Sequence, residues 1–352
     1  MKISKLFALG LFGTFLLNSC SSDDDGFVEV PEENEEQAYE EGVIILNEGS
    51  QAAGTVSFLD WEFTAVENNI FETVNEDMDT DLGMYTQSIF FDEDHAYIIS
   101  NGSNLITVVD RYTFEYVGIV DSGLNVPYYG VAYNGKAYVS NYAEFDNAED
   151  DFVAIIDLET LEVESTVVAE FNIEEVKEED GLIYFEGTYF GAGNSIKVFD
   201  PSTNTFTGSI DTNDGLNSFE VDDNLLYALS STQIQQIDIT SGEEIWALDL
   251  PEAMQGASNL QIEDGVIYFT SGTSVYAVSE TELELPTEAL FSYESSSAWG
   301  AMYGFAVEDG YIYTSDGGDF ASAGTIEIYT TAGDFVAEFS VGIGPNSFYF
   351  ND

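Results

Sequence analysis

The stretch Asn134-Gly135-Lys136-Ala137-Tyr138-Val139-Ser140 decides the fold, because variants of it return along most of the chain. In most copies a turn containing Gly precedes a short apolar strand, and a tyrosine lies at the same place in each strand. Six copies are visible, with their tyrosines at Tyr97, Tyr138, Tyr184, Tyr227, Tyr268 and Tyr313. These tyrosines lie 41, 46, 43, 41 and 45 residues apart, a period at which each repeat can supply about four strands. The spacing predicts a β-propeller.

Each repeat has the same internal order. An extended run leads into an Asp-Gly or Asn-Gly turn, then a second strand, a third strand and a hairpin follow. Asp-Gly and Asn-Gly supply the positive φ angles that two-residue hairpins require. Several third strands end in turns such as residues 157–160 and 200–203, where an Asp side chain can hydrogen-bond to the turn backbone.

The two ends of the repeat region complete one repeat between them. Residues 345–352 match a first strand and stop where its turn should begin, whereas residues 42–49 match a second strand and residues 54–60 a third. Pairing them would remove exposed sheet edges. We therefore predict an all-β protein, a seven-bladed β-propeller over residues 42–352 that is closed by pairing of its N- and C-terminal strands in one blade. Six blades or an irregular β-sandwich are the alternatives.

The N-terminus has the form of a secretory signal. Positive charge over Met1 to Lys5 precedes an apolar run from Leu6 to Leu17, which is too short to span a bilayer. We predict a signal peptide over residues 1–19. Leu17-Asn18-Ser19-Cys20 resembles the lipobox of bacterial lipoproteins, which implies that Cys20 is acylated. A stray free thiol is the alternative, and a single cysteine excludes a disulfide framework.

Residues 20–41 are predicted to form an acidic flexible tether, because they are rich in Glu and Asp. Residues 21–26 resemble the acidic signal that places some lipoproteins on the outer face of the outer membrane. This predicts a lipid-anchored outer-membrane protein that faces the cell exterior, with the periplasmic leaflet as the alternative.

The formal net charge of −61 is unusually negative. After the signal peptide only Arg111, Lys136, Lys177 and Lys197 are basic. Such a field repels nucleic acid, so no nucleic-acid partner is expected. Solubility in a salty habitat explains the bias better than cation binding does. Residues 146–151 could hold calcium but lack the spacing of a dedicated loop, so no metal site is predicted.

Catalytic residues are not evident. The one histidine, His95, is predicted to lie in a surface turn between first and second strands, which argues against a Ser-His-Asp triad or a multi-His metal site. Carboxylate pairs are unavoidable among 67 acidic residues and indicate little about hydrolysis. The sequence therefore predicts a protein that is not an enzyme and has no cofactor.

Ligand binding is better supported. Aligning the repeats places a residue able to hydrogen-bond at one equivalent position near the start of each first strand: Gln87, Tyr128, Glu174, Asn217, Ser258, Tyr303 and Asn346. The next position holds Ser88, Tyr129, Glu175, Ser218, Asn259, Gly304 and Ser347. Loop aromatics of the same face are Tyr85, Tyr142, Phe145, Tyr189, Phe190, Trp299 and Phe320. Aromatics with a few convergent polar groups are typical of small-molecule sites. The predicted ligand-binding residues are Tyr85, Gln87, Tyr128, Tyr129, Tyr142, Asn217, Asn259, Trp299, Tyr303 and Asn346. Alternatively, these groups satisfy strand ends and channel waters.

Residues 42–49, with the strings at residues 108–113 and 134–142, resemble the YncE-like propeller lipoproteins of the DUF5074 type. The resemblance covers roughly residues 42–352. Its BtuG-type branch captures vitamin B12 and passes it to a TonB-dependent outer-membrane transporter. The resemblance implies a ligand such as cobalamin or a related corrinoid, a transporter partner, and a monomer outside that complex. A flat ligand rimmed with amides suits Asn, Gln and Tyr side chains. The alternatives are an interaction scaffold or adhesin, and an enzyme of the lactonase or quinoprotein kind.

Overall fold

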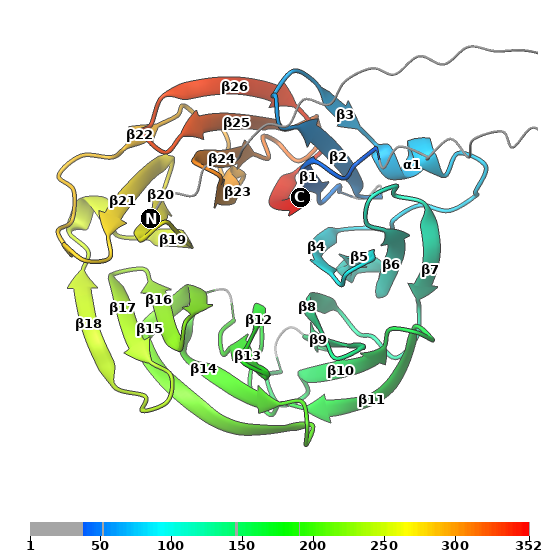
Figure 1. Ribbon diagram of the computed structural model, residues 1–352, viewed down its shortest axis with the longest axis horizontal. Coiled ribbons are helices and arrows are strands. Elements are labelled where there is room, and N and C mark those ends of the chain that lie inside the picture. The colour runs from blue at the N-terminus through cyan, green and yellow to red at the C-terminus, as the bar shows by residue number, and fades with distance from the viewer. Residues whose placement is uncertain (1–37, 51–52, 145–146, 190, 352) are drawn as a thin grey trace, which may run out of the picture. The chain divides into compact units, whose positions relative to one another are not determined.

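Antiparallel strands make up nearly all of the regular structure in the computed structural model, which describes residues 38–50, 53–144, 147–189 and 191–351 (Figure 1). The signal peptide, Cys20, Asp146, Phe145 and Phe190 lie outside the described residues. Residues 37–352 form one compact unit by their contacts. Among the described residues, no helix is long and apolar enough to cross a membrane. The predicted all-β class is confirmed.

The strands form six sheets within the described residues. The first contains, in spatial order, β27 (Pro345–Asn351), β1 (Gly42–Asn47), β2 (Thr55–Asp60) and β3 (Val66–Asn68). The next two are β4 (Thr86–Phe91), β5 (His95–Ser100), β6 (Leu105–Asp110) and β7 (Tyr116–Val120), and then β8 (Pro127–Tyr133), β9 (Lys136–Asn141), β10 (Phe152–Asp157) and β11 (Glu162–Val168). A short helix, α1 (Ile70–Val74), precedes β4.

The largest sheet has seven strands. It contains β12 (Val176–Glu179), β13 (Leu182–Glu186), β14 (Gly193–Asp200), β15 (Thr205–Asp222), β16 (Leu225–Ser230), β17 (Gln233–Asp238) and β18 (Glu244–Asp249). The last two sheets are β19 (Ala257–Glu263), β20 (Val266–Ser271), β21 (Ser274–Ser279) and β22 (Phe291–Ser292), and then β23 (Ala301–Glu308), β24 (Tyr311–Asp316), β25 (Thr325–Thr330) and β26 (Phe335–Ser340).

The 18-residue strand β15 differs from the sequence prediction, which placed a blade boundary within it. Its first half pairs with β14 and its second half with β16, so two four-stranded units share one strand. The connection stays extended because it contains no proline, and only Gly215 takes a positive φ there. Two predicted blades therefore lie in one continuous sheet.

The N- and C-terminal strands pair as predicted. β1 lies between β27 and β2, with Gly42 opposite Asn351 and Leu46 opposite Ser347. Every residue of β1 is buried, because its two edges and both faces are covered. The first sheet therefore depends on segments from both ends of the described chain.

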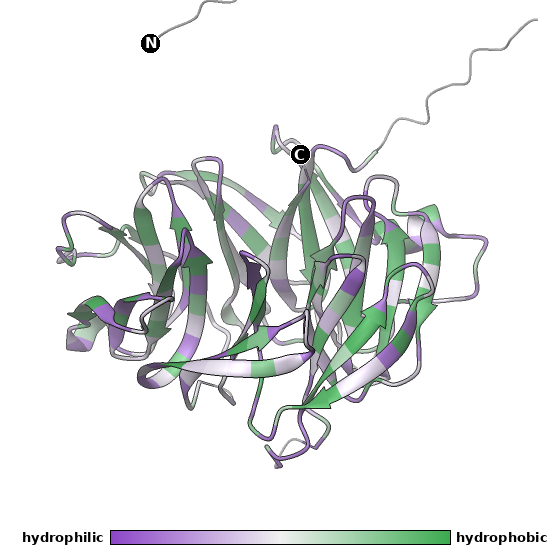
Figure 2. Cartoon of the chain, turned by 60° about the horizontal axis from the view of Figure 1, so that its bottom comes forward, coloured by the Kyte–Doolittle hydropathy of each residue, from purple (hydrophilic) through white to green (hydrophobic). Residues whose placement is uncertain are grey.

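Contacts between the sheets form a closed series. The strand that begins each four-stranded unit packs against its counterpart in the next unit, in the order β4, β8, β12, β15, β19, β23, β27 and back to β4 (Figure 1). Apolar residues run along the strands, whereas the connecting loops are more polar (Figure 2). The repeated tyrosines are buried within the hydrophobic clusters between neighbouring units, so the motif that defines the repeat is a core residue.

The turns after the third strands follow one chemical rule. A side-chain oxygen at the turn's first residue accepts a hydrogen bond from a backbone N–H two to four residues later. The accepting residues are Asp60, Asp110, Asp157, Asp200, Asp238, Ser279 and Thr330. At Asp157 these hydrogen bonds lower the carboxyl pKa. The turn chemistry predicted for residues 157–160 and 200–203 is confirmed.

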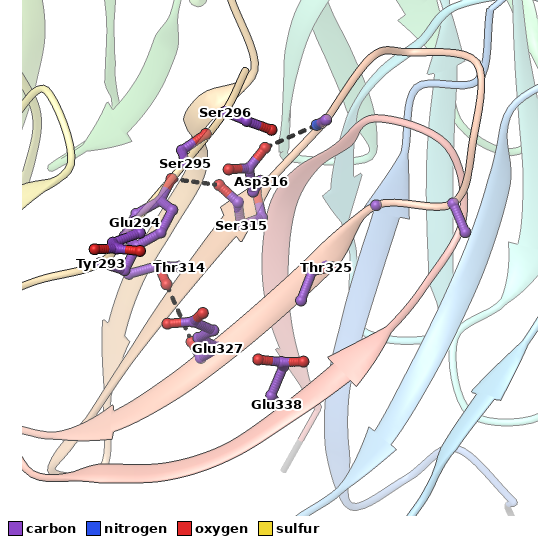
Figure 3. Close-up of a pocket in the computed structure, with 13 residues that line it drawn as sticks. Tyr293, Glu294, Ser295, Ser296, Thr314, Ser315, Asp316, Thr325, Glu327 and Glu338 are labelled. Atoms are coloured by element: carbon purple, nitrogen blue, oxygen red, sulfur yellow. Dashed lines mark hydrogen bonds between the residues drawn. The ribbon is translucent and has the colours of Figure 1, made fainter.

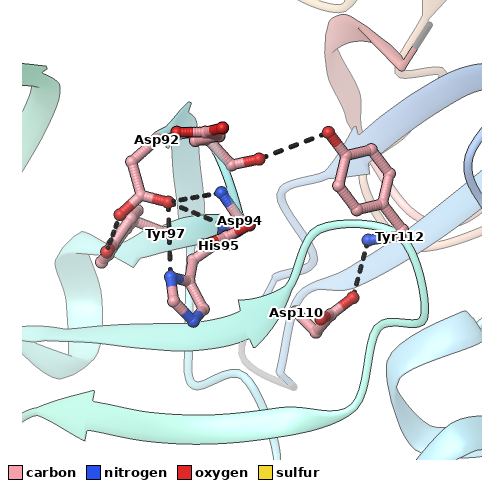
Figure 4. Close-up of polar contacts among 7 residues, drawn as sticks. Asp92, Asp94, His95, Tyr97, Asp110 and Tyr112 are labelled. Atoms are coloured by element: carbon pink, nitrogen blue, oxygen red, sulfur yellow. Dashed lines mark hydrogen bonds and ion pairs between the residues drawn. The ribbon is translucent and has the colours of Figure 1, made fainter.

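His95 lies at a hairpin turn, where its sequence context predicts it (Figure 4). Oδ1 of Asp92 accepts hydrogen bonds from the backbone N–H groups of Asp94 and His95, at 3.0 and 2.7 Å. His95 Nδ1 lies 3.3 Å from the same carboxylate, and Oδ2 of Asp92 accepts a hydrogen bond from Tyr97. The Asp92 carboxylate therefore organises a turn that lacks the Asp-Gly pair of other repeats.

Arg111, the one arginine of the sequence, joins the two ends of the unit. Its Nε donates to Asn351 Oδ1 at 2.7 Å, and its guanidinium lies 5.0 Å from the centre of the Phe91 ring. The side-chain amide of Asn351 donates to the backbone oxygen atoms of Tyr39 and Arg111. Tyr39 is 4% exposed and packs against Phe58, so part of the segment predicted as a tether belongs to the core.

Candidate functional site

Eight of the ten predicted ligand-binding residues, all except Tyr142 and Trp299, lie where the first strands begin. We call this end of the unit the strand-start face and define it by residues 85–88, 126–129, 172–175, 215–218, 256–259, 300–304 and 344–347. A cavity of about 330 Å³ opens there. Five of the ten predicted residues line it, namely Tyr129, Asn217, Asn259, Tyr303 and Asn346. The cavity is lined mostly by amide, hydroxyl and carboxylate groups.

The three asparagines of the cavity join neighbouring sheets. The side-chain amide of Asn217 donates to Ala257 O at 2.8 Å, and that of Asn259 to Met302 O at 3.4 Å. The amide of Asn346 donates to the backbone oxygen atoms of residues 86 and 87. In each case the acceptor lies on the strand that begins the next unit. These amide N–H groups therefore satisfy strand ends, as the alternative interpretation of the sequence anticipated.

Gln87 and Tyr129 continue this polar contact. Gln87 Nε2 lies 3.5 Å from Tyr129 OH, and Gln87 Oε1 accepts a hydrogen bond from Asn101 Nδ2 at 3.0 Å. Ser88 Oγ donates to Tyr128 O at 2.7 Å. Burial raises the pKa of Tyr129, so its hydroxyl stays protonated. These groups form a continuous polar wall from β4 to β8.

Aromatic rings form a second part of the face. The ring of Tyr128 lies 5.4 Å from that of Tyr129 and 4.4 Å from that of Tyr142, and Tyr142 lies 6.0 Å from Tyr189. Tyr142 is only 1% exposed, so it supports its neighbours rather than meeting a ligand directly. Burial and the charge of Glu174 raise the pKa of Tyr142. We call these four packed rings, Tyr128, Tyr129, Tyr142 and Tyr189, the aromatic cluster.

Tyr303 anchors the opposite part of the face. Its hydroxyl donates a hydrogen bond to Glu48, and its ring meets Phe320 edge-on at 4.9 Å. Burial raises the pKa of Glu48, while the hydrogen bond from Tyr303 lowers it. Glu48 was not among the predicted site residues, although it lies in the Asn-Glu-Gly string of residues 47–49. Glu48 is the first residue after a second strand, as the predicted residue Tyr142 is in another repeat. This equivalence was the signal that could have identified it.

Two predicted residues stand apart from the cavity. Trp299 is 87% exposed and Tyr85 is 37% exposed, so both rings reach solvent. Trp299 follows Ser297, whose Oγ donates to Gly318 O at 2.6 Å and fixes the base of that loop. Of the ten predicted residues, five line the cavity, and Gln87, Tyr128 and Tyr142 lie beside it. Tyr85 and Trp299 are left on the rim.

A charged network borders the cavity, which its members Glu175 and Gln261 help to line, and it was not anticipated. Lys177 Nζ is 3.1 Å from Glu175 Oε1 and 3.0 Å from Glu220 Oε2. Gln261 donates to the other oxygen of Glu220 at 3.0 Å. Burial lowers the pKa of Lys177, but the charges of Glu175 and Glu220 outweigh this and raise it overall. The network joins β12, β15 and β19.

Two deeply buried carboxyl groups belong to residues that hydrogen-bond to the segment 172–175. Asp151 is fully buried and Glu186 is 2% exposed. Among the described residues, Asp151 Oδ1 and Glu186 Oε1 have no hydrogen-bond partner. Burial raises the pKa of Asp151 to about 7, and burial with the charge of Glu175 raises the pKa of Glu186 well above its usual range. Since charged carboxylates are costly to bury unpaired, these groups favour the protonated form.

A separate cavity of about 310 Å³ lies beside β24 and β25 (Figure 3). Ser295 and Ser296 line it from the loop before β23, with Asp316 at the end of β24. Glu327 and Glu338, opposite each other on β25 and β26, also line it. Within the described ranges, no group of three or more His, Cys, Asp or Glu side chains is arranged to hold a metal ion.

The relation of the chain to known proteins can now be stated. The DUF5074 family, described as a domain of unknown function, matches residues 41–259. The chain belongs to the DUF5074 family. The match includes the Asn-Glu-Gly string, the aromatic cluster and the first part of the charged network of this DUF5074 chain. A search of curated proteins found no significant match.

Solved structures share the fold of this DUF5074 protein at low sequence identity. A computationally designed protein, Ika8, is 11% identical with a TM-score of 0.58, and the match covers 90% of this chain and 92% of that one. Hydrazine synthase of Kuenenia stuttgartiensis is 19% identical with a TM-score of 0.58, over 74% of this chain and 88% of the matched chain. At these identities the likeness concerns the fold alone.

Proposed function

We propose that the protein is a surface lipoprotein whose seven-bladed β-propeller binds cobalamin or a related corrinoid on the strand-start face. The closed series of contacts between first strands supports seven blades, if the seven-stranded sheet is counted as two units that share β15. The pairing of β27 with β1 supports closure of the ring within one blade. Membership of the DUF5074 family supports that part of the resemblance, and the BtuG-type branch is carried over from the resemblance as part of this proposal.

The observation that carries the ligand proposal is the union of aromatic rings and polar groups on one face. Tyr128, Tyr129 and Tyr303 are held by packing and hydrogen bonds around a cavity of about 330 Å³. That volume is at the lower end for small-molecule sites, and a corrinoid is larger than the usual drug-sized ligand. The corrinoid would therefore lie across the face and place only an edge or one amide side chain in the cavity.

The scarcity of basic residues is compatible with this assignment, whereas the strong negative charge limits how a corrinoid can be oriented. A corrinoid is recognised through amides and a flat apolar ring system, which need no arginine cluster. Its phosphodiester would be repelled by Glu174 and Glu175, so it would point away from the cavity. In this proposal Cys20 carries the lipid anchor on the outer membrane, and a TonB-dependent transporter receives the ligand.

Isothermal titration tests the proposal. The secreted chain carrying Cys20→Ser, which cannot be acylated, is titrated with cyanocobalamin at micromolar protein. We expect saturable heat with one ligand per chain and a shift in the cobalamin absorption spectrum. Absence of both signals would reject the corrinoid while leaving the fold unaffected.

The exposed Trp299 favours a second candidate, an interaction scaffold or adhesin that uses the same face. A ring that is 87% exposed has little structural role of its own. A scaffold would bind the transporter equally well with and without cobalamin, as measured by co-purification from membranes. A ligand-delivering protein would instead show binding that depends on the vitamin.

A further inference from the structure

Tyr85 has an unusual backbone conformation at the strand-start face. It immediately precedes β4 and has a φ of 56°, in the left-handed region that favours glycine. The equivalent positions before Leu216, Ala257 and Pro345 are Gly215, Gly256 and Gly344, and all three have positive φ. Tyrosine thus occupies a position that other units give to glycine, at a cost in stability.

The segment around Tyr85 is held rigidly. Its backbone oxygen accepts a hydrogen bond from Asn101 N at 3.1 Å, and Met84 O accepts one from Gly102 N at 3.1 Å. Met84 N donates to Ser103 Oγ at 2.9 Å. These three hydrogen bonds join the segment to the turn between β5 and β6. The strained conformation is therefore imposed by its surroundings.

The structure also makes room for the Tyr85 ring. A Cβ atom added at Gly102 would lie 2.5 Å from Tyr85 Cδ2, so any larger residue there would displace the ring. The ring is nevertheless 37% exposed, and its neighbour Met84 is 39% exposed. Val126 has a similar φ of 50° before β8 but is only part-exposed and carries no ring. Tyr85 alone of these two combines strain with an exposed aromatic surface.

Backbone strain at a residue whose ring is partly exposed points to a functional position. We propose that Tyr85 is a specificity-determining residue whose ring, supported by Gly102, stands at the rim as a wall against the flat face of the bound ligand. This inference rests on the proposed function, because the ligand is taken to be the corrinoid. Met84 extends the same apolar wall.

Two pairs of variants test the inference by stability and by binding. Tyr85→Ala and Tyr85→Gly both remove the ring and differ by a single Cβ atom. If the backbone is strained, the glycine variant has the higher melting temperature, the reverse of the order at an ordinary position. A higher melting temperature for Tyr85→Ala would overturn the strain argument.

The second test measures binding of cyanocobalamin to the Cys20→Ser chain and to its variants. We expect both Tyr85 variants to lose at least about tenfold in affinity, equivalent to ~1.4 kcal/mol. Gly102→Ala should weaken binding by displacing the ring, whereas Gly208→Ala, on an outer strand with room for a Cβ atom, should leave it unchanged. Normal binding by the Tyr85 variants would overturn this inference and leave the proposed function standing. No binding by the parent chain would reject both.

Discussion

The two ends of the strands in this protein differ in how much they repeat. At the end that carries the hairpin turns, the same solution recurs, with an Asp, Ser or Thr side chain accepting backbone N–H groups after each third strand. At the strand-start face the units differ more: two of them share Asn followed by Ser, and the others hold different combinations of amide, carboxyl, hydroxyl and aromatic side chains at the equivalent positions. The repeated turns thus stabilise the fold, whereas the residues that differ between units lie on the surface where selection for binding can act.

The largest expected effect concerns closure, on which both ends depend. Deleting residues 345–352 removes β27, exposes one edge of the fully buried β1, and removes the partners of Arg111. We expect loss of the cooperative unfolding transition in thermal circular dichroism, since β1 would lose all of its hydrogen bonds on one side. Phe335→Ala, on the exposed face of β26, is the control and should keep a cooperative transition. A cooperative transition in the truncated chain would show that closure is dispensable.

Removing Lys177 tests whether the strand-start face carries charges that the fold needs. Lys177→Met leaves Glu175 and Glu220 partly buried without a cation. We expect a loss of about 3 kcal/mol in the free energy of unfolding, because the remaining carboxylates are uncompensated. The measurement is urea unfolding at pH 8.

The matched control is Lys136→Met, which breaks an ion pair with Glu164 between two solvent-exposed side chains. Exposed pairs contribute little, so its unfolding midpoint should stay close to that of the parent. Equal losses for the two lysine variants would contradict the distinction between the two regions.

Asp151 gives a prediction about pH. Its pKa is raised to about 7 by burial, so the folded protein holds a proton that the unfolded chain releases above about pH 4. The contribution of Asp151 to the free energy of unfolding is therefore greatest below pH 4, falls as pH rises from 4 to 7, and stays low above pH 7. The expected total is about 2–4 kcal/mol.

The measurement for Asp151 is urea unfolding at pH 5 and pH 8, compared with Asp151→Asn. The asparagine variant keeps a carbonyl oxygen for the N–H groups of Ile173 and Asn172 but cannot ionise. It should be more stable than the parent at pH 8 and should show a smaller difference between the two pH values. The charges of Asp150 and Glu174 remain in both proteins. Identical pH profiles would remove the case for a protonated Asp151.

The smallest effect is expected at the repeating turns. Asp110→Ala removes the acceptor for the N–H groups of Tyr112 and Thr113, each at 2.9 Å. Because the turn is partly exposed and water can replace the carboxylate, we expect a loss of only ~1 kcal/mol, measured by thermal unfolding. A loss as large as that for Lys177→Met would show that the turns are as specialised as the strand-start face.

The sequence predicts the features that recur in the repeats but not those that occur in only one place. The spacing of the tyrosines, the Asp turns and the pairing of residues 42–47 with residues 345–351 could be predicted because each follows from local chemistry that recurs. The continuity of β15 could not, because strand propensity alone does not show where a sheet is interrupted. The network of Lys177, Glu220 and Gln261 joins three strands that lie far apart in sequence, so no single motif contains it.

The candidate site shows the same limit. Alignment of the repeats placed Asn217 and Asn346 at one equivalent position and Asn259 at the next, but it did not show that all three side-chain amides donate to the neighbouring sheet. Burial likewise separates the supporting ring of Tyr142 from the exposed ring of Trp299, although both were predicted as loop aromatics. Side-chain environment, which a sequence does not record, decides which residues can meet a ligand.

The position of β27 also sets the order in which the molecule can be completed during synthesis. β1 is made well before its neighbour on one side, which is formed by residues 345–351. Until then the nascent chain keeps one apolar strand edge open and prone to aggregation. A chain exported during its synthesis would thus need protection of residues 42–47 until β27 has been made.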